Sequence, residues 1–239
     1  MIRHLLQLIW NQRKQNAWLW AELLLVSVFL WFLVDYLYVM GRTYTAPLGF
    51  DIRHTYSSLS ERSPDYIPKE KRERPDGVHL LTALDRIRTY PGVESACLTD
   101  GGMPYYMGSR NLVWRIDTLQ VPCRYAFVTP EFFDVFRIYD KDGKTASLKR
   151  AIEDNNSIVI SADVETMNPG LSLLGQKAYR GNVTDEIEET IRGISVPIRR
   201  HEYTKAEPNV YRALRLSRME EGYYEGMIDA VRLCVRVRP

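Results

Sequence analysis

The apolar residues of the chain are concentrated in one long run near its start, which a long stretch of mixed composition follows. The run covers residues 17–40 (AWLWAELLLVSVFLWFLVDYLYVM). At ~1.5 Å per residue, a helix of this length spans about 36 Å, which is enough to cross a hydrocarbon core of about 30 Å. The run therefore predicts a transmembrane helix over residues 17–40. A buried core helix is disfavoured, because the run is apolar on all sides and rich in tryptophan and phenylalanine.

Two carboxylates, Glu22 and Asp35, interrupt this run and bracket an uncharged stretch of residues 23–34. A charge at the centre of a bilayer is costly, so their placement toward the two interfaces fits a spanning helix. Carboxylates inside a membrane usually face protein or water instead of lipid. We therefore expect Glu22 and Asp35 to contact other helices in an assembly.

The first 16 residues are predicted to form a cytoplasmic leader. Arg3, Arg13 and Lys14 lie there without any acidic residue, and the positive-inside bias keeps such a segment in the cytoplasm. Residues 2–9 place apolar side chains on one helical face, which is typical of a helix in the membrane interface, although a simple basic topology signal gives the same charges. The apolar run is longer than a signal-peptide core and no A-x-A site follows it, so the anchor is predicted to be uncleaved.

Residues 41–239 are predicted to form an extracytoplasmic domain of the α+β class, with one or two subdomains and antiparallel pairing. Helical spacing of apolar residues predicts a helix over residues 76–90, which a strand follows at 93–98. Residues 47–60 and 190–203 are also expected to be strands. Alternation of valine and leucine with arginine predicts a final strand over residues 227–237.

The middle of this domain shows turn and cap signals. Two strands are expected within residues 111–128 around a turn at Asp117, and Thr129 is expected to cap a short helix over residues 130–136. The polar residues 141–156 are expected to form an exposed connection before a buried strand at residues 157–161.

Charge and motif content exclude several classes of function. The formal net charge is only +2, from 32 Lys and Arg against 30 Asp and Glu, and the two signs alternate, so nucleic acid is not an expected partner. No phosphate-binding loop, G-x-S-x-G elbow or HExxH motif occurs, and the four histidines have no ligand spacing. We therefore assign no catalytic, cofactor-binding or metal-binding residue and predict that the chain is not an enzyme.

The loop over residues 101–110 (GGMPYYMGSR) is the best candidate for a contact surface. Glycine and proline favour a loop, while its Met103, Tyr105, Tyr106 and Met107 offer adaptable apolar surface. The same side chains could instead fold back over the core. The three cysteines, Cys97, Cys123 and Cys234, allow at most one disulfide; we interpret them as core residues, with a bridge between Cys97 and Cys123 as the alternative.

An ordered series of segments resembles the ABC transporter permeases of the MacB and FtsX type. The series begins with the first 30 residues and continues with PLGFD, LDRIRTYPGVESACLT, YAFVTPEFFDVFRI, NNSIVISADV and LLGQKA. The resemblance covers nearly the whole chain and implies a first transmembrane helix that leads into a MacB-like periplasmic core domain. Members of this family continue into three more transmembrane helices, whereas this chain stops at Pro239, which suggests a fragment or a truncated gene product.

The resemblance further implies a non-catalytic permease subunit in the cell inner membrane, whose ATP-binding partner is a separate chain. Such a permease resembles a homo- or heterodimer, and its role would be export of an unknown substrate or mechanotransmission across the envelope. The alternative is a single-span, membrane-anchored binding module without an ATPase. An anchored enzyme is the least favoured reading, because no catalytic constellation is visible.

Overall fold

The chain is described by a computed structural model in two compact units, Met1–Ala46 and Pro47–Pro239. We call the second the C-terminal unit. The predicted leader, residues 1–16, lies outside the described residues except for three helical positions. The described residues are 3, 7, 10, 17–58, 76–106, 108, 110–154, 156–180, 187–221 and 230–239.

The first unit contains the long helix α2 (Ala17–Thr45), which covers 29 residues and therefore extends past the predicted span. Its most apolar window has a mean hydropathy of 2.2, and none of its residues is buried against the rest of the chain. By length and composition it is the one helix among the described residues that could cross a membrane. At ~1.5 Å per residue it is about 43 Å long.

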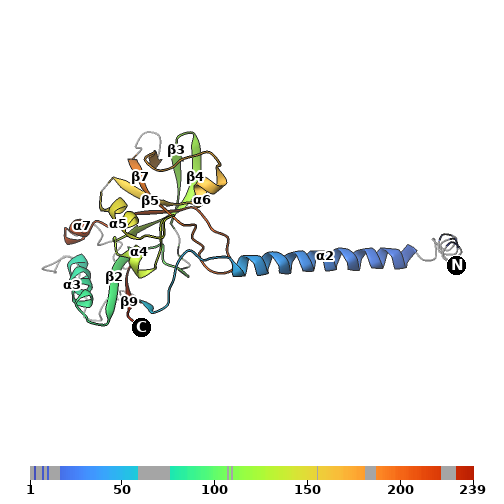
Figure 1. Ribbon diagram of the computed structural model, residues 1–239, viewed down its shortest axis with the longest axis horizontal. Coiled ribbons are helices and arrows are strands. Elements are labelled where there is room, and N and C mark those ends of the chain that lie inside the picture. Colours follow the sequence, from blue (N-terminus) through green and yellow to red (C-terminus); the bar gives the residue numbers. More distant parts are fainter. Residues whose placement is uncertain are drawn as a thin grey trace. The chain divides into compact units, whose positions relative to one another are not determined.

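The C-terminal unit is a mixture of strands and short helices, which confirms the predicted α+β class (Figure 1). Its strands are β1 (Thr55–Ser58), β2 (Val93–Asp100), β3 (Arg110–Ile116), β4 (Leu119–Val128), β5 (Ser157–Ser161), β6 (Lys177–Arg180), β7 (Ile187–Ser195), β8 (Asn209–Ala213) and β9 (Val231–Val237). Its helices are α3 (Asp76–Arg88), α4 (Phe132–Val135), α5 (Ala146–Glu153), α6 (Asp163–Met167) and α7 (Leu216–Glu220).

Six strands pair into a closed ring in the order β4-β3-β6-β7-β5-β8, and β8 returns to β4. The β4–β8 and β5–β7 pairs are parallel and the others are antiparallel. Alternate side chains of these strands fill the interior, among them Trp114 and Ile116 from β3 and Ile158 and Ile160 from β5. Period-2 alternation thus turns one face of each ring strand toward the interior, and β5, whose five residues are all buried, packs on its outer face as well.

The remaining strands form the three-stranded sheet β1-β9-β2, which joins the ring where Thr99 and Asp100 of β2 pair with the end of β4. Helix α3 packs on β2, and its Leu84 is fully buried in a cluster with Leu98 and Leu233. Helix α4 contacts β2 and β9 through another hydrophobic cluster, to which Phe132, Phe133 and Cys234 belong. Strand β9 is therefore buried on both faces.

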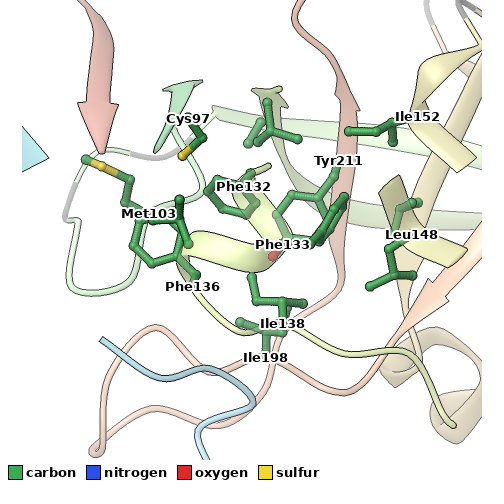
Figure 2. Packing of buried hydrophobic residues seen from close by; sticks show 14 of the residues in the cluster. Cys97, Met103, Phe132, Phe133, Phe136, Ile138, Leu148, Ile152, Ile198 and Tyr211 are labelled. Carbon is green, nitrogen blue, oxygen red and sulfur yellow. The ribbon is translucent and has the colours of Figure 1, made fainter. Parts of the chain in front are cut away.

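Helix α4 lies at the centre of this other cluster. Figure 2 shows its Phe132 and Phe133 beside Tyr211 of β8, with ring centroids 5.5 and 5.6 Å from that of Tyr211. Cys97 of β2 and Leu148 of α5 belong to the same cluster. The cluster thus joins the strand ring to the three-stranded sheet.

Several predicted elements differ from the observed ones. The predicted connection over residues 141–156 contains helix α5, whose one buried face is formed by Leu148, Ala151 and Ile152. Thr129 does not cap α4; its hydroxyl accepts a hydrogen bond from the Leu98 amide, 3.2 Å away, because the side chain points toward β2. The entering strand is only four residues long.

Candidate functional site

Shortly after α2, residues Pro47–Ser58 form what we call the entry segment, which contacts the rest of the C-terminal unit along nearly its whole length. The Leu48 carbonyl accepts a hydrogen bond from the Arg199 amide at 3.0 Å, and the Asp51 amide donates to the Phe136 carbonyl at 2.8 Å. The segment then continues as β1, which pairs with β9. Backbone contacts with three separate parts of the C-terminal unit thus hold it in place.

Gly49 allows the closest of these approaches. Its φ is +82°, and a Cβ atom at this position would lie 2.1 Å from the Pro197 carbonyl oxygen. Any side chain would push the entry segment away from residue 197, and a positive φ is itself costly for residues other than glycine. Phe50, the next residue, contacts the ring of Tyr105 edge-on at 6.0 Å.

Four charged side chains form a cluster around the entry segment: Asp51 and Arg53 of that segment, Arg137 after α4 and Arg236 of β9. We call it the Asp51 cluster. The Asp51 carboxylate lies 3.2 Å from the Arg53 Nε atom, 3.8 Å from Arg137 and 3.9 Å from Arg236. Three arginines from separate parts of the chain thus converge on one carboxylate.

Arg236 is the member that enters the core, with a relative exposure of 1%. Its guanidinium donates to the Val135 carbonyl at 2.7 Å, to the Arg53 carbonyl at 2.9 Å and to the Asp51 carbonyl. A buried arginine is tolerated when its donors are satisfied, and these acceptors come from α4 and the entry segment. One side chain of β9 therefore ties these two parts together.

Two members of this region have a backbone conformation that non-glycine residues rarely adopt. Arg137 has φ +49° and His54 has φ +58°. Arg137 follows α4 in a Schellman-type ending, in which the Ile138 amide donates to the Phe133 carbonyl at 2.9 Å and the left-handed position is normally glycine. The side chain of Arg137 reaches Asp51 and Glu94 at 3.8 and 3.6 Å, contacts that a glycine at this position could not make.

The cluster borders a recess with a volume of about 210 Å³, which His54 and Glu94 also line. Burial alone would raise the pKa of Asp51, but hydrogen bonds from Arg53 and the charge of Arg236 outweigh it, so the pKa lies below its ordinary value. Burial, followed by the neighbouring charge of Arg137, lowers the pKa of Arg236. Asp51 is thus held in its ionised form, which the arginines require.

The predicted contact loop divides into buried and accessible side chains. Met103 is in the core cluster and 9% exposed, and Tyr106 packs against the same cluster. Tyr105 is 40% exposed; its amide donates to the Arg200 carbonyl at 3.0 Å and its hydroxyl to Glu202. Met107 lies outside the described residues. Of this loop, Tyr105 offers the most surface to a partner among the three described side chains.

Glu22 and Asp35 are both exposed on α2. Their positions differ by thirteen, which places them about 20 Å apart along the axis and about 140° apart around it. The two carboxylates therefore lie on different sides of α2. Their separation agrees with positions toward opposite ends of a hydrocarbon core of about 30 Å.

The described histidines do not converge on a site. No group of three or more histidine, cysteine or acidic side chains that could hold a metal ion occurs within the described ranges. Cys97, Cys123 and Cys234 are all buried and unbonded, as expected of core residues. Cys97 and Cys123 belong to different hydrophobic clusters, whereas Cys97 and Cys234 are directly opposite on β2 and β9.

Sequence reasoning missed the Asp51 cluster because its members are far apart in the sequence. Arg236 donates to the carbonyl of Arg53, which lies 183 positions earlier. Alternation along the last strand predicted a polar face for Arg236. The available signal was an arginine between Val235 and Val237, two residues after Cys234.

Comparison with known proteins gives structural similarity at low identity. No protein-family model and no curated protein matches the chain. A domain of a protein from Porphyromonas gingivalis that is described as a permease aligns at 23% identity over 65% of this chain and 66% of that chain, with a TM-score of 0.46. The match therefore spans just under two thirds of that domain.

Two further solved structures are similar. The extracellular domain of the noncanonic ABC-type transporter YknZ from Gram-positive bacteria aligns at 11% identity over 77% of this chain and 84% of that chain, with a TM-score of 0.47. The periplasmic region of MacB from Actinobacillus actinomycetemcomitans aligns at 9% identity over 82% of this chain and 79% of that chain, with a TM-score of 0.45. MacB is one of the two types that the ordered sequence series resembles.

Proposed function

We propose that the chain is a non-catalytic permease component of an ABC transporter, which couples ATP hydrolysis by a separate subunit to export or to mechanotransmission. The observation that carries this proposal is the attachment of the entry segment. The chain passes from α2 directly into this segment, so a displacement of the helix reaches the C-terminal unit through Pro47–Ser58 first. Backbone hydrogen bonds, the Asp51 cluster and pairing with β9 then transfer it.

The ordered sequence series supports the same proposal, because it runs through both the apolar helix and the C-terminal unit. In this proposal residues 1–16 are a cytoplasmic leader, 17–40 span the inner membrane and 41–239 form the extracytoplasmic domain. A second permease chain and the ATP-binding subunit are the partners. Glu22 and Asp35 contact neighbouring helices, and the loop around Tyr105 contacts an envelope partner.

The first test identifies partners. The complete gene product, expressed from its native locus, is purified in mild detergent and its co-purifying proteins are identified by mass spectrometry. We expect a nucleotide-binding subunit, and Tyr105→Ala should leave that subunit bound while an envelope partner is lost. Recovery of envelope proteins alone would favour the single-span binding module, which the single candidate span among the described residues also fits.

The second test addresses mechanical coupling. A flexible insertion of six glycine and serine residues between Ala46 and Pro47 lengthens the connection that transmits the displacement. The matched control places the same insertion in the turn at Asp117, between β3 and β4. In the purified assembly, an ATP-dependent change in hydrogen exchange of β9 should disappear with the first insertion and persist with the second. Equal responses in both variants would contradict coupling through the entry segment.

A further inference from the structure

Three sulfur-containing residues, Cys97, Cys234 and Met103, lie in one buried cluster of the C-terminal unit. Cys97 and Cys234 are fully buried and belong to the cluster around α4. The Cys234 thiol donates to the Met103 sulfur at 3.2 Å, and the two thiols are themselves hydrogen-bonded. Figure 2 shows Cys97 and Met103 around Phe132 in this cluster.

The pairing of the strands places the two cysteines opposite each other. Cys97 of β2 is the Cα partner of Cys234 of β9, and the neighbouring pairs Ala96 with Val235 and Leu98 with Leu233 keep the same register. Directly opposite residues of antiparallel strands have Cα atoms about 4.5–5.5 Å apart. Disulfides join Cα atoms about 4.4–6.8 Å apart, so the strands need no large movement to form this bond.

We propose that Cys97 and Cys234 are a disulfide site that fastens the last strand covalently to β2. The co-reactant is a thiol–disulfide oxidant. The thiolate of one cysteine attacks the oxidant's disulfide and releases one thiol; the second thiolate attacks the mixed disulfide and releases the other. Two protons and two electrons leave the protein, and they appear as the two thiols of the reduced oxidant.

Burial determines when this exchange takes place. Burial, followed by the hydrogen bond with Cys234, raises the pKa of the Cys97 thiol well above its ordinary value. The thiolate is the reactive species, so Cys97 of the folded protein reacts slowly. The bond therefore forms while β2 and β9 are still accessible during folding, and the closed core then protects it.

The consequence concerns the Asp51 cluster. Arg236, which holds the entry segment, is two residues from Cys234 on the same strand. Once the disulfide has formed, a force on the entry segment acts through Arg236 on β9, which is then covalently joined to β2. An oxidising compartment, in which disulfides persist, is available only on the extracytoplasmic side; this point alone rests on the proposed function.

The test uses the full chain in detergent, so that its outcome is independent of membrane topology. The chain is reduced, unfolded in urea and refolded with a mixture of oxidised and reduced glutathione; free thiols are then alkylated and the protein is digested with trypsin. The three cysteines fall in separate tryptic peptides, residues 89–110, 116–124 and 233–236. We expect residues 89–110 linked to 233–236 in most molecules, with Cys123 alkylated.

Single variants complete the test. Cys123→Ser should leave the linked peptides unchanged, and Cys97→Ser and Cys234→Ser should each abolish them without a new link to Cys123. A wild-type chain that regains its near-ultraviolet circular dichroism with all three cysteines alkylated would overturn the proposal, as would a dominant link to Cys123. If refolding yields are low, the folded chain from membranes is incubated in the same glutathione mixture with moderate urea, and the same peptides decide.

Discussion

The guanidinium of Arg236 donates to the backbone carbonyl of Asp51 while its charge also faces the Asp51 carboxylate at 3.9 Å. This relationship joins the last described strand of the chain to the segment that follows its apolar helix. A change in either residue should therefore affect both the stability of the C-terminal unit and the transfer of movement into it.

Replacing Arg236 with methionine should lower the free energy of unfolding by about 3 kcal/mol, because three backbone carbonyls lose a charged, buried donor. Arg238→Met, one residue past the end of β9 and exposed, is the matched control and should stay within about 0.5 kcal/mol of the wild type. Urea unfolding of the full chain in detergent, followed by near-ultraviolet circular dichroism, measures both. Equal losses in the two variants would contradict the role assigned to Arg236.

The stability contributed by Asp51 should depend on pH. Its pKa is lower in the folded chain than its ordinary value of about 3.9, so folding favours the ionised form. The contribution is therefore complete above that ordinary value and is lost as pH falls through the lower, folded pKa. Asp51→Asn should cost roughly 1 kcal/mol at pH 7 and much less at pH 3, as measured by thermal unfolding at both pH values. A cost that is the same at both would exclude the charge as its origin.

Two variants of Arg137 distinguish the effect of backbone strain on stability from the effect of the side-chain contacts. Arg137→Gly should raise the free energy of unfolding by up to about 1 kcal/mol, because glycine adopts φ +49° without strain and the ion pairs that are lost are long and half-exposed. Arg137→Ala removes the same charge and keeps the strain, so it should be the less stable of the two variants in the same unfolding assay. If the proposed mechanical role is correct, both should weaken the ATP-dependent response of β9.

Gly49→Ala should destabilise the C-terminal unit by about 2–4 kcal/mol, because the new methyl group combines a positive φ with a clash against Pro197. Gly175→Ala is the matched control: its φ is +85° but no atom lies within 4 Å of the added Cβ. The difference between the two variants in thermal unfolding isolates the clash. Equal losses of stability in the two variants would mean that the entry segment can move away from Pro197 at little cost.

Glu22→Gln and Asp35→Asn should each weaken the proposed assembly, and the double variant should weaken it by the sum of the two free-energy changes, because the two positions are about 140° apart around α2. Ser27→Ala, within the same helix, serves as the control. Native mass spectrometry in detergent gives the fraction of assembled chains. Unchanged assembly in both neutral variants would show that neither carboxylate contributes to contacts between helices.

The elements with strong periodicity could be predicted from the sequence. The apolar run, the helix ending before Pro91 and the alternating last strand are all present near the predicted bounds. Helix α5 was missed because only one narrow face of it is apolar. Thr129 was misassigned because a Thr-Pro-Glu sequence is a typical helix start, and only the tertiary fold shows that Leu98 is the hydroxyl's partner.

The candidate site was largely beyond prediction. A single sequence does not give the register of β2 against β9, and only that register brings Cys97 to Cys234 instead of Cys123. The burial of Arg236 likewise depends on carbonyl groups that two distant segments, α4 and the entry segment, supply. Of the loop around residues 101–110, the sequence indicated the glycine-rich conformation, while the separation of buried Met103 from accessible Tyr105 required the fold.

The antiparallel pairing of β1 with β9 determines how the ladder bears a load. Thr55 is opposite Arg236 and Ser58 is opposite Leu233, so the beginning of β1 and the end of β9 lie at the same end of the strand pair. A pull along the axis of β1 acts parallel to the strands and perpendicular to their hydrogen bonds. The rungs are then sheared together instead of opening one after another, and even a four-residue strand can resist withdrawal as a unit.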